Sequence, residues 1–394
     1  MVESETEEKR RRAKRLLSLA VIPGILCLWS CGSTRTGGTK REAPAETVPP
    51  SVIEEIKNGP RVYGTVSFLG SDRELDLSHE SLDVFGLIGA LSQTAVERVE
   101  LGENAPTTDE ALALAANCPG VFFRYDTEFF GQRLSTEATE IDLSGVKLKD
   151  TFALERELVR FPKLQKLILC DCGLDDHTLD ELNTRLGDTR VVWTVQVYNK
   201  GIRTDRDYFI MYNCETTYPR SNGTCAALRY CSDMIAVDVG HFSPTDEDLK
   251  FLYGTPKLKY LVAIEGLYTD ITPMGSLPEL EYLEMFASQA RDLTPLLNCK
   301  KLQHLNISRC CKLDASCIDV LCQMKQLKRL WFIGNYLSPK YEQVLKDALP
   351  DTEIHFIPYR NGFAPYSMDF DWRKDESYYA MRDALHMYYM DNQK

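Results

Sequence analysis

The sequence predicts an α/β solenoid, in which short parallel strands stack side by side and connecting segments return the chain across the other side. The first observation is a period, because the pattern Leu-x-x-Leu-x-apolar begins three times between Leu258 and Cys311, at intervals of 22 residues. The second is a turn repeated at the same interval, Asp270-Ile-Thr-Pro273 and Asp292-Leu-Thr-Pro295. A fixed period of this length indicates repeats that each bury an apolar face on their neighbours.

Length and composition agree with a folded repeat protein and exclude some partners. The chain has 394 residues, enough for one long repeat array or for two or three ordinary domains, and its hydrophobic fraction of 44% excludes wholesale disorder. The formal net charge is −12. An acidic chain has no surplus of cations to displace counterions from a phosphate backbone, so no nucleic-acid partner is expected.

Residues 1–30 have the pattern of a signal peptide. Six lysines and arginines between positions 9 and 15 precede Leu16–Ser30, an apolar run of 15 residues interrupted by Pro23 and Gly24. This run is short for a membrane span of about 20 residues and suits the apolar core of a signal peptide. An uncleaved signal anchor is the alternative. Both interpretations place the rest of the chain outside the cytoplasmic membrane.

The apolar run ends in Leu28-Trp29-Ser30-Cys31-Gly32, which resembles the lipobox of bacterial lipoproteins. In that family the cysteine becomes the lipidated first residue of the mature chain. The resemblance therefore implies lipidation at Cys31 and anchoring to the cell membrane of a bacterium. Residues 31–60 are rich in Gly, Thr, Pro and Ser and are predicted to form a flexible tether.

Two repeat blocks are predicted, at 61–200 and 230–357, with an irregular insert at 201–229 between them. In each turn an apolar-x-apolar pair marks a short strand whose apolar residues point inward. The markers are Leu75, Val99, Val121, Ile141, Leu167, Val191, Val237, Leu261, Leu283, Leu305, Leu330 and Ile354. A degenerate turn is predicted around Phe209–Tyr212.

The connecting segments are predicted to be of two kinds. Helix starts followed by apolar residues at three and four spacing predict helices at Thr107–Ala116, Asp175–Leu186, Thr245–Tyr253 and Pro339–Leu349. The turns with Pro273 and Pro295 are too short for a full helix, so extended or 3₁₀ segments are expected there.

The pattern resembles leucine-rich repeats, Leu-x-x-Leu-x-Leu-x-x-Asn/Cys-x-Leu. Residues Leu164–Leu174 match throughout, and Leu327–Leu337 match with Phe332 for one leucine. The two Asp-x-Thr-Pro turns are similar to the repeats of bacterial internalins, and with the lipobox the chain resembles a bacterial leucine-rich repeat surface lipoprotein. The resemblance implies parallel strands on a concave face, helices or 3₁₀ segments on the convex face, and a protein partner.

Eleven cysteines follow Cys31, and most are predicted to pack as small buried side chains. Cys172 and Cys310 fall at the Asn/Cys position of the repeat, while Cys214 and Cys225 could form one disulfide in the insert. Cys170 and Cys172 diverge in strand register, so no metal site and no cofactor are expected. His304 and Ser308 lie about 13 Å apart along one strand, too far for a nucleophile and its base. No enzyme is predicted.

The concave face of the second block is the predicted partner-binding surface. The outward positions of the first block carry an acidic row that includes Glu74, Glu100 and Glu140, whereas those of the second block carry aromatic and aliphatic side chains. Contiguous patches of this kind mark interaction sites. The predicted partner-binding residues are Tyr260, Val262, Ile264, Tyr282, Phe286, His304, Trp331 and Ile333. Two alternatives remain, that these residues only stabilise the sheet, or that the C-terminal segment folds over them.

Residues 358–394 are predicted to form a helical cap over the open end of the array. Tyr378, Met381, Leu385 and Tyr388 keep helical spacing, and the last repeat of an array needs a cover. A helix presented to a second protein is the alternative. The sequence therefore predicts a membrane-tethered, extracytoplasmic, non-catalytic protein that binds another protein through its concave face. The alternative function is a cell-wall glycan-binding or structural spacer lipoprotein.

Overall fold

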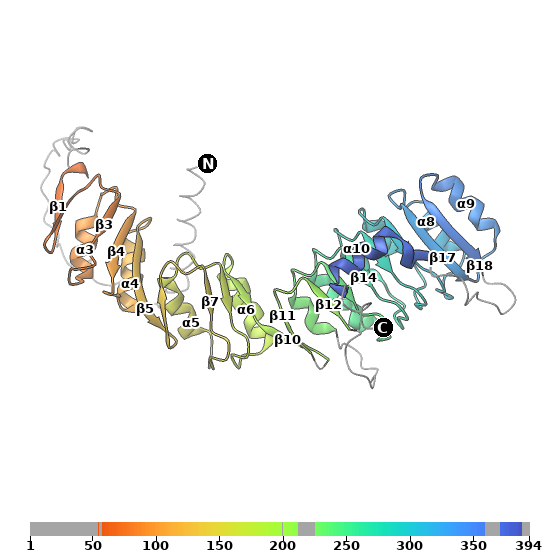
Figure 1. The fold of residues 1–394 in the computed structure, drawn as a ribbon, viewed down its shortest axis with the longest axis horizontal. Coiled ribbons are helices and arrows are strands. Elements are labelled where there is room, and N and C mark those ends of the chain that lie inside the picture. Colours follow the sequence, from red (N-terminus) through yellow and green to blue (C-terminus); the bar gives the residue numbers. More distant parts are fainter. Residues whose placement is uncertain (1–53, 55–56, 199, 212–224, 359–370, 388–394) are drawn as a thin grey trace, which may run out of the picture. The chain divides into compact units, whose positions relative to one another are not determined.

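The computed structural model describes residues 54, 57–198, 200–211, 225–358 and 371–387 (Figure 1). The chain divides into two compact units, Met1–Ile168 with Cys172–Val191, and Leu169–Asp171 with Val192–Lys394. The predicted signal peptide, Cys31 and nearly all of the tether lie outside the described residues. Within the described part of the chain, no helix has the length and apolar character needed to cross a bilayer.

The first unit contains three small sheets covered by helices. Its strands are β1 (Pro60–Tyr63), β2 (Val66–Leu69), β3 (Glu74–Asp76), β4 (Arg98–Gly102), β5 (Phe122–Phe129), β6 (Gln132–Ser135), β7 (Glu140–Asp142), β8 (Lys166–Ile168) and β9 (Arg190–Val192). Its helices are α3 (Val84–Leu91), α4 (Thr108–Asn117), α5 (Phe152–Glu157), the 3₁₀ helix η1 (Leu158–Arg160) and α6 (Asp176–Leu186). The strand orders are β1-β2, β3-β4-β5-β6 and β7-β8-β9.

The first unit follows the predicted period with two departures. Leu75 pairs with Val99 and Ile141 pairs with Leu167, each in parallel register. The predicted marker Val121 is wrong, because the Val121 N–H bonds the Cys118 carbonyl at the end of α4 and Phe123 pairs with Val99 instead. The hairpins β1–β2 and β5–β6 are antiparallel and were not predicted.

The second unit is built on one sheet of seven parallel strands, in the order β12-β13-β14-β15-β16-β17-β18. The strands of the unit are β10 (Thr194–Val197), β11 (Lys200–Arg203), β12 (Tyr208–Ile210), β13 (Ala236–Asp238), β14 (Tyr260–Val262), β15 (Tyr282–Glu284), β16 (His304–Asn306), β17 (Arg329–Asn335) and β18 (Glu353–Pro358). Its helical segments are η2 (Ala226–Tyr230), α7 (Asp246–Leu249), η3 (Lys250–Gly254), η4 (Thr272–Ser276), η5 (Thr294–Asn298), α8 (Ser316–Leu321), α9 (Lys340–Ala348), η6 (Asp371–Lys374) and α10 (Glu376–Ala384).

The predicted stack of inward apolar residues is confirmed in this sheet. Leu261, Leu283, Leu305 and Leu330 pair with one another in parallel register, and each is fully buried. Side chains alternate between the two faces of a strand, so this row fixes which neighbours point the other way. The second unit is therefore a repeat solenoid of parallel strands.

Most predicted connecting helices are confirmed. Thr107 caps α4 through a reciprocal capping box with Glu110, and Asp175 caps α6 through the Thr178 N–H. The helical segment after Thr245 has the predicted extent, but only its first four residues are α-helical, and the 3₁₀ helix η3 follows α7 directly. The two Asp-x-Thr-Pro turns form the 3₁₀ helices η4 and η5, as expected.

A ladder of side chains joins successive turns at the Asn/Cys position of the repeat. The Asn335 amide donates to the Ile307 carbonyl over 3.1 Å, and the Cys310 thiol donates to the Met285 carbonyl over the same distance. Burial raises the pKa of Cys310 to about 11, so the thiol keeps the proton that it donates. The packing role predicted for Cys310 has this physical basis. Cys118, Cys172 and Cys299 are also buried.

The insert predicted at 201–229 is more regular than expected. β11 pairs with β10 as an antiparallel hairpin, and β12 joins the parallel sheet with Phe209 opposite Val237. The degenerate turn predicted around Phe209 is thereby confirmed, and its strand belongs to the second unit. Cys214 lies outside the described residues, while Cys225 is fully buried and its N–H donates to Asp248.

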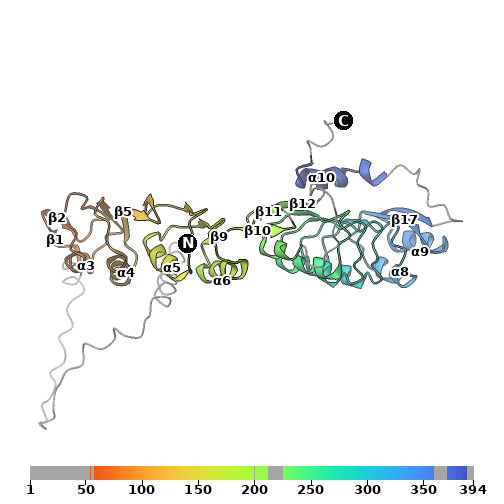
Figure 2. The ribbon, with the colours of Figure 1, turned by 90° about the horizontal axis from the view of Figure 1, so that it is seen from below.

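The described part of the C-terminal segment does not cover the open end of the array. α10 lies on the opposite side of the sheet from α8 and α9, against the outward face of the strands (Figure 2). Met381 and Leu385 of this segment join Ala236, Val262 and Tyr282 in one apolar cluster. The predicted position of the cap is therefore wrong for the described residues, because their apolar stripe packs on the outward row of side chains and not on the end of the array.

Candidate functional site

The outward strand face of the second unit, which the sequence analysis expects to be the concave face, presents residues in parallel rows, one residue from each strand. The first row runs from Ala236 through Tyr260, Tyr282 and His304 to Arg329. The predicted alignment of Tyr260, Tyr282 and His304 in successive turns is confirmed. The second row contains Asp238, Val262, Glu284, Asn306 and Trp331, each two positions along the same strands.

The segment from Trp372 to Leu385, named here the strap, lies across these rows. It comprises most of η6, all of α10 and the residue after it. Trp372, Met381 and Leu385 are buried, with exposed fractions of 4%, 3% and 0%. Tyr260, Phe286 and Tyr378 pack around the same apolar cluster, and the Trp372 ring lies 5.5 Å from the Phe286 ring. The strap thus occupies much of the surface that the sequence assigns to a partner.

A buried carboxylate lies beneath the strap. The Trp372 indole N–H donates to Oε1 of Glu284 over 3.0 Å, and the Tyr282 hydroxyl donates to Oε2 over 3.1 Å. Burial raises the pKa of Glu284 to about 7, with a further contribution from the nearby charge of Asp238, while the two hydrogen bonds act in the opposite direction. The protonated acid is therefore favoured at Glu284 far more than at an exposed glutamate.

An ion pair fixes the start of the strap helix. Asp375 is buried, pairs with Arg329 of the first row, and accepts a hydrogen bond from the Ser377 N–H as the N-cap of α10. Arg329 also pairs with Glu353 on the next strand over 3.5 Å. One aspartate therefore caps the start of the helix and attaches it to the sheet.

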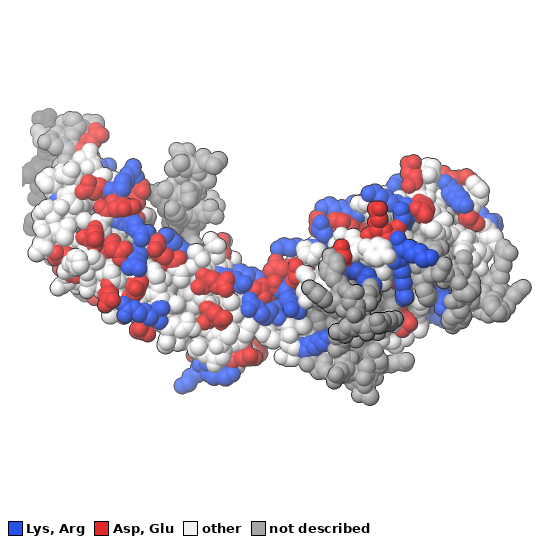
Figure 3. Space-filling model, in the orientation of Figure 1, with Lys and Arg blue, Asp and Glu red and all other residues white. Residues whose placement is uncertain are grey.

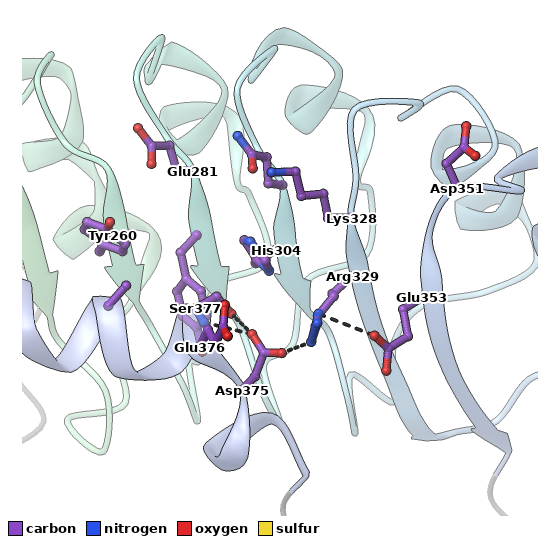
Figure 4. A pocket seen from close by; sticks show the side chains of 13 residues that line it. Tyr260, Glu281, His304, Lys328, Arg329, Asp351, Glu353, Asp375, Glu376 and Ser377 are labelled. Atoms are coloured by element: carbon purple, nitrogen blue, oxygen red, sulfur yellow. Dashed lines mark hydrogen bonds and ion pairs between the residues drawn. The ribbon is translucent and has the colours of Figure 1, made fainter.

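A cavity of about 600 Å³ lies between the start of α10 and strands β14–β18 (Figure 4). Tyr260, Tyr282 and His304 form its floor, and Glu376 and Ser377 border it on the strap side. Glu281, Lys328 and Asp351 are arranged on the side away from the helix (Figure 4). The floor is aromatic, whereas the edges are charged.

His304 is held neutral within a row of stacked rings. Its ring centroid lies 6.4 Å from that of Tyr282 and 6.5 Å from that of Trp331, which in turn lies 6.0 Å from that of His355. Burial, followed by the charges of Arg329 and Lys328, lowers the pKa of His304 to about 4. Ser308 is 1% exposed and accepts a hydrogen bond from the Ile333 N–H, so it has a structural contact of its own.

The eight predicted partner-binding residues lie together, but they are not equally accessible. Val262, Ile264, Tyr282 and Trp331 are buried, whereas Tyr260, Phe286, His304 and Ile333 are half-buried. Their binding of a partner stays a prediction. Sequence reasoning missed Glu284 and Asp375. The helical spacing of Met381 and Leu385 indicated that the segment docks. The alternative that it folds over the predicted binding residues agrees with the structure, and the predicted cap over the end of the array does not.

The acidic row predicted in the first unit is partly paired with cations. Glu100 pairs with Arg124 over 3.0 Å, and Glu140 pairs with Lys166 over 3.7 Å. Glu137, outside the predicted row, bonds Arg98 and Lys163, and these hydrogen bonds lower its pKa. Both charge signs are intermixed over this unit on the face viewed in Figure 3. A uniformly acidic surface is therefore not present there.

Metal ligation has no support in the described residues, where no three His, Cys, Asp or Glu side chains gather closely enough to hold an ion. Cys170 and Cys172 are both buried free thiols. The candidate site is thus a covered aromatic and apolar face with the buried carboxylates of Glu284 and Asp375.

No protein-family model matches the chain, and no curated protein sequence matches it either. Solved structures that it resembles are repeat proteins. A leucine-rich repeat protein of Leptospira interrogans has 15% identity and a TM-score of 0.32, with 68% of this chain and 74% of that chain covered. An internalin of Listeria monocytogenes, InlF, has 14% identity and a TM-score of 0.27, with 71% and 94% covered.

The chain also resembles TLR13 in its complex with ssRNA13, at 17% identity and a TM-score of 0.30, with 73% of this chain covered. It spans only 37% of the length of that receptor chain. At these identities and TM-scores, nothing about a ligand or a partner transfers to this chain.

Proposed function

We propose that this protein is a membrane-tethered, extracytoplasmic binding protein that recognises another protein through the concave face of its second unit and has no catalytic activity of its own. The observation that carries this proposal is the strap itself. The face already holds a peptide segment through buried apolar side chains and the hydrogen bond from Trp372 to Glu284. A surface that accommodates one helical segment has the shape and chemistry for protein recognition by helix-in-groove contacts.

The partner-binding residues in this proposal are the same eight that the sequence indicates: Tyr260, Val262, Ile264, Tyr282, Phe286, His304, Trp331 and Ile333. Aromatic anchors in a desolvated setting contribute most of the binding free energy at protein interfaces. Glycan binding by stacking has less support, because it needs an open ring face. Trp331, the largest ring of the set, is only 1% exposed.

A peptide-display experiment tests protein recognition directly. The chain is immobilised, and a library of random linear peptides is selected on it, while insoluble peptidoglycan is tested separately by co-sedimentation. We expect enriched peptides whose binding is lost with Phe286→Ser and retained with Tyr253→Ser, since Tyr253 is 59% exposed on η3. Co-sedimentation with peptidoglycan, without any peptide that depends on Phe286, would favour the spacer or glycan function.

The membrane tether rests on the lipobox-like residues that end in Cys31. A lipid attached at this cysteine would hold the folded units at the outer side of the membrane through residues 31–60. A clickable fatty-acid analogue should label the wild-type chain and fail to label Cys31→Ala, which should also leave the membrane fraction. Equal labelling of both chains would contradict a lipid anchor at this position.

A further inference from the structure

The array beneath the strap is complete without it. The inward row of Leu261, Leu283, Leu305 and Leu330 is fully buried within the strands and connecting segments on the other side of the sheet. Backbone hydrogen bonds between turns, such as Ala263 N–H to the Glu284 carbonyl at 2.8 Å, also involve no strap residue. The strap therefore covers a finished surface.

The strap uses the same positions that a partner would need. Its cluster includes Tyr260, Val262, Ile264, Tyr282 and Phe286, all of them on the proposed binding surface. A partner helix and the strap cannot occupy these residues at the same time. Binding of a partner protein at these residues therefore requires that the strap is undocked.

Docking of the strap combines favourable and unfavourable contributions. Burial of the Trp372, Met381 and Leu385 side chains favours the docked state. Burial of the Glu284 carboxylate opposes it, because an ionised carboxylate loses its hydration, and undocking returns this group to water. The strap helix also has exposed positions at Tyr379, Ala380 and Asp383, so the released segment remains compatible with water.

We propose that the strap is an internal ligand of the concave face, and that the partner protein binds by presenting an amphipathic helix with a preceding tryptophan that takes the place of the strap. This inference rests on the proposed function. The strap defines the chemistry of the partner segment: a tryptophan donor for Glu284, an acidic N-cap for Arg329, and two apolar residues one helical turn apart that fill the positions of Met381 and Leu385.

The test uses the full chain and a synthetic fluorescein-labelled peptide with the sequence of residues 371–387. Two double variants are compared with the wild type. Trp372→Ala/Leu385→Ala removes two buried strap contacts, and Tyr379→Ala/Asp383→Ala changes two exposed positions on the same helix, where Tyr379 is 54% exposed. Fluorescence anisotropy measures binding of the peptide, and of a control peptide that carries Trp372→Ala.

We expect the first double variant to bind the peptide at least about tenfold more tightly than the wild type or the control variant, because an occupied face reduces the fraction of competent molecules. The control peptide should bind about tenfold more weakly to the same chain, because it cannot donate to Glu284. Equal binding by all three chains, or no binding by a folded first variant, would overturn the inference.

Hydrogen exchange of the wild-type chain provides a measurement that needs no variant. Amides of α10 should exchange faster than those of β15 and β16, since a displaceable segment opens locally while the array stays folded. Exchange of α10 only together with these strands would make the strap a structural part of the array and overturn the proposal. If the peptide fails to bind but displayed peptides still depend on Phe286, the strap inference fails and protein recognition stands.

Discussion

Trp372 and Glu284 are 88 residues apart in sequence, yet the indole N–H of one donates to the buried carboxylate of the other over 3.0 Å. Glu284 lies in the second outward row of the sheet, between Val262 and Asn306 on the neighbouring strands. A carboxylate in such a position needs hydrogen-bond donors, because its water has been removed. Trp372 provides one donor and Tyr282 provides the other.

The first prediction concerns this donor. Trp372→Phe retains an aromatic ring against Phe286 and removes the N–H, so Glu284 keeps only the Tyr282 hydroxyl. Loss of one hydrogen bond to a buried group costs about 1–3 kcal/mol. Hydrogen exchange of α10 should therefore become faster, and the free energy of local opening should fall by that amount. Tyr379→Phe is the matched control. An equal change in the exchange rate of α10 in both variants would contradict the role assigned to the indole N–H.

The second prediction is a pH dependence. Burial raises the pKa of Glu284 from 4.5 to about 7. The folded state therefore favours the protonated acid, and this contribution to stability is present below pH 4.5 and is lost as the pH rises through 7. The Glu284→Gln side chain stays neutral at every pH, has nearly the same shape and keeps one carbonyl oxygen that can accept a hydrogen bond. At pH 8 it should hold the strap more firmly than the wild type, by about 3 kcal/mol, while at pH 4.5 the difference should nearly vanish.

Other groups near Glu284 also titrate, and they do so in the wild type and in Glu284→Gln alike. Burial raises the pKa of Asp238 to about 6 and lowers that of His304 to about 4. The His304 contribution has the opposite sign, because it is lost as the pH falls below 6.5. The comparison of Glu284→Gln with the wild type largely cancels both. Strap opening measured by hydrogen exchange at several pH values, with Glu247→Gln as an exposed control, should show the difference only for Glu284. Parallel pH profiles for Glu284→Gln and the wild type would contradict the assignment.

The third prediction concerns Tyr282 and Trp331, the aromatic residues with which the sequence most strongly indicated partner binding. The sequence alone predicts that replacing both with serine abolishes binding and leaves the melting temperature nearly unchanged. Each residue is only 1% exposed, so the structure predicts a different result. Tyr282→Ser and Trp331→Ser should each lower the free energy of unfolding by about 3–5 kcal/mol. Urea unfolding measures this loss, with Tyr253→Ser as the exposed control. A loss below about 1 kcal/mol would show that both side chains contribute little to stability and would contradict their structural role.

The period of the sequence was sufficient to predict the sheet of the second unit. Leu261, Leu283 and Leu305 lie in the predicted register, and so do Tyr260, Tyr282 and His304 on the other face. The reason is physical, since a strand alternates its side chains and a stacked array repeats the same contacts at each turn.

The turns after the strands could not be predicted in the same way. Glu265, Ala287 and Arg309 adopt positive φ angles of 56°, 57° and 58° at the same position of successive repeats, although none is glycine. Their N–H groups bond carbonyls of the following turn, at Phe286, Ser308 and Ile333. Hydrogen bonds between turns therefore select this conformation, and no local residue preference indicates it.

The position of the strap had no local signal either. Its helical spacing predicted an apolar stripe at Met381 and Leu385, but both the end of the array and the concave face offered apolar surface. The choice depends on groups far apart in sequence, namely Trp372 with Glu284 and Asp375 with Arg329. Such pairs become visible only when the strands are placed side by side.

The last prediction concerns the thiols of the second unit. Cys299 donates to the Met274 carbonyl over 3.2 Å and Cys310 to the Met285 carbonyl over 3.1 Å, and burial raises the pKa of each to about 11. Cys311, next in sequence, is exposed. Because the thiolate is the reactive form and needs access, iodoacetamide should label Cys311 in the folded chain and reach Cys299 and Cys310 only after unfolding in urea. Peptide mass spectrometry before and after denaturation measures this order. Labelling of Cys310 at the rate of Cys311 under native conditions would contradict its place in the ladder. It would mean that the Cys310 thiol is as accessible as an exposed side chain and that its hydrogen bond to Met285 does not protect it.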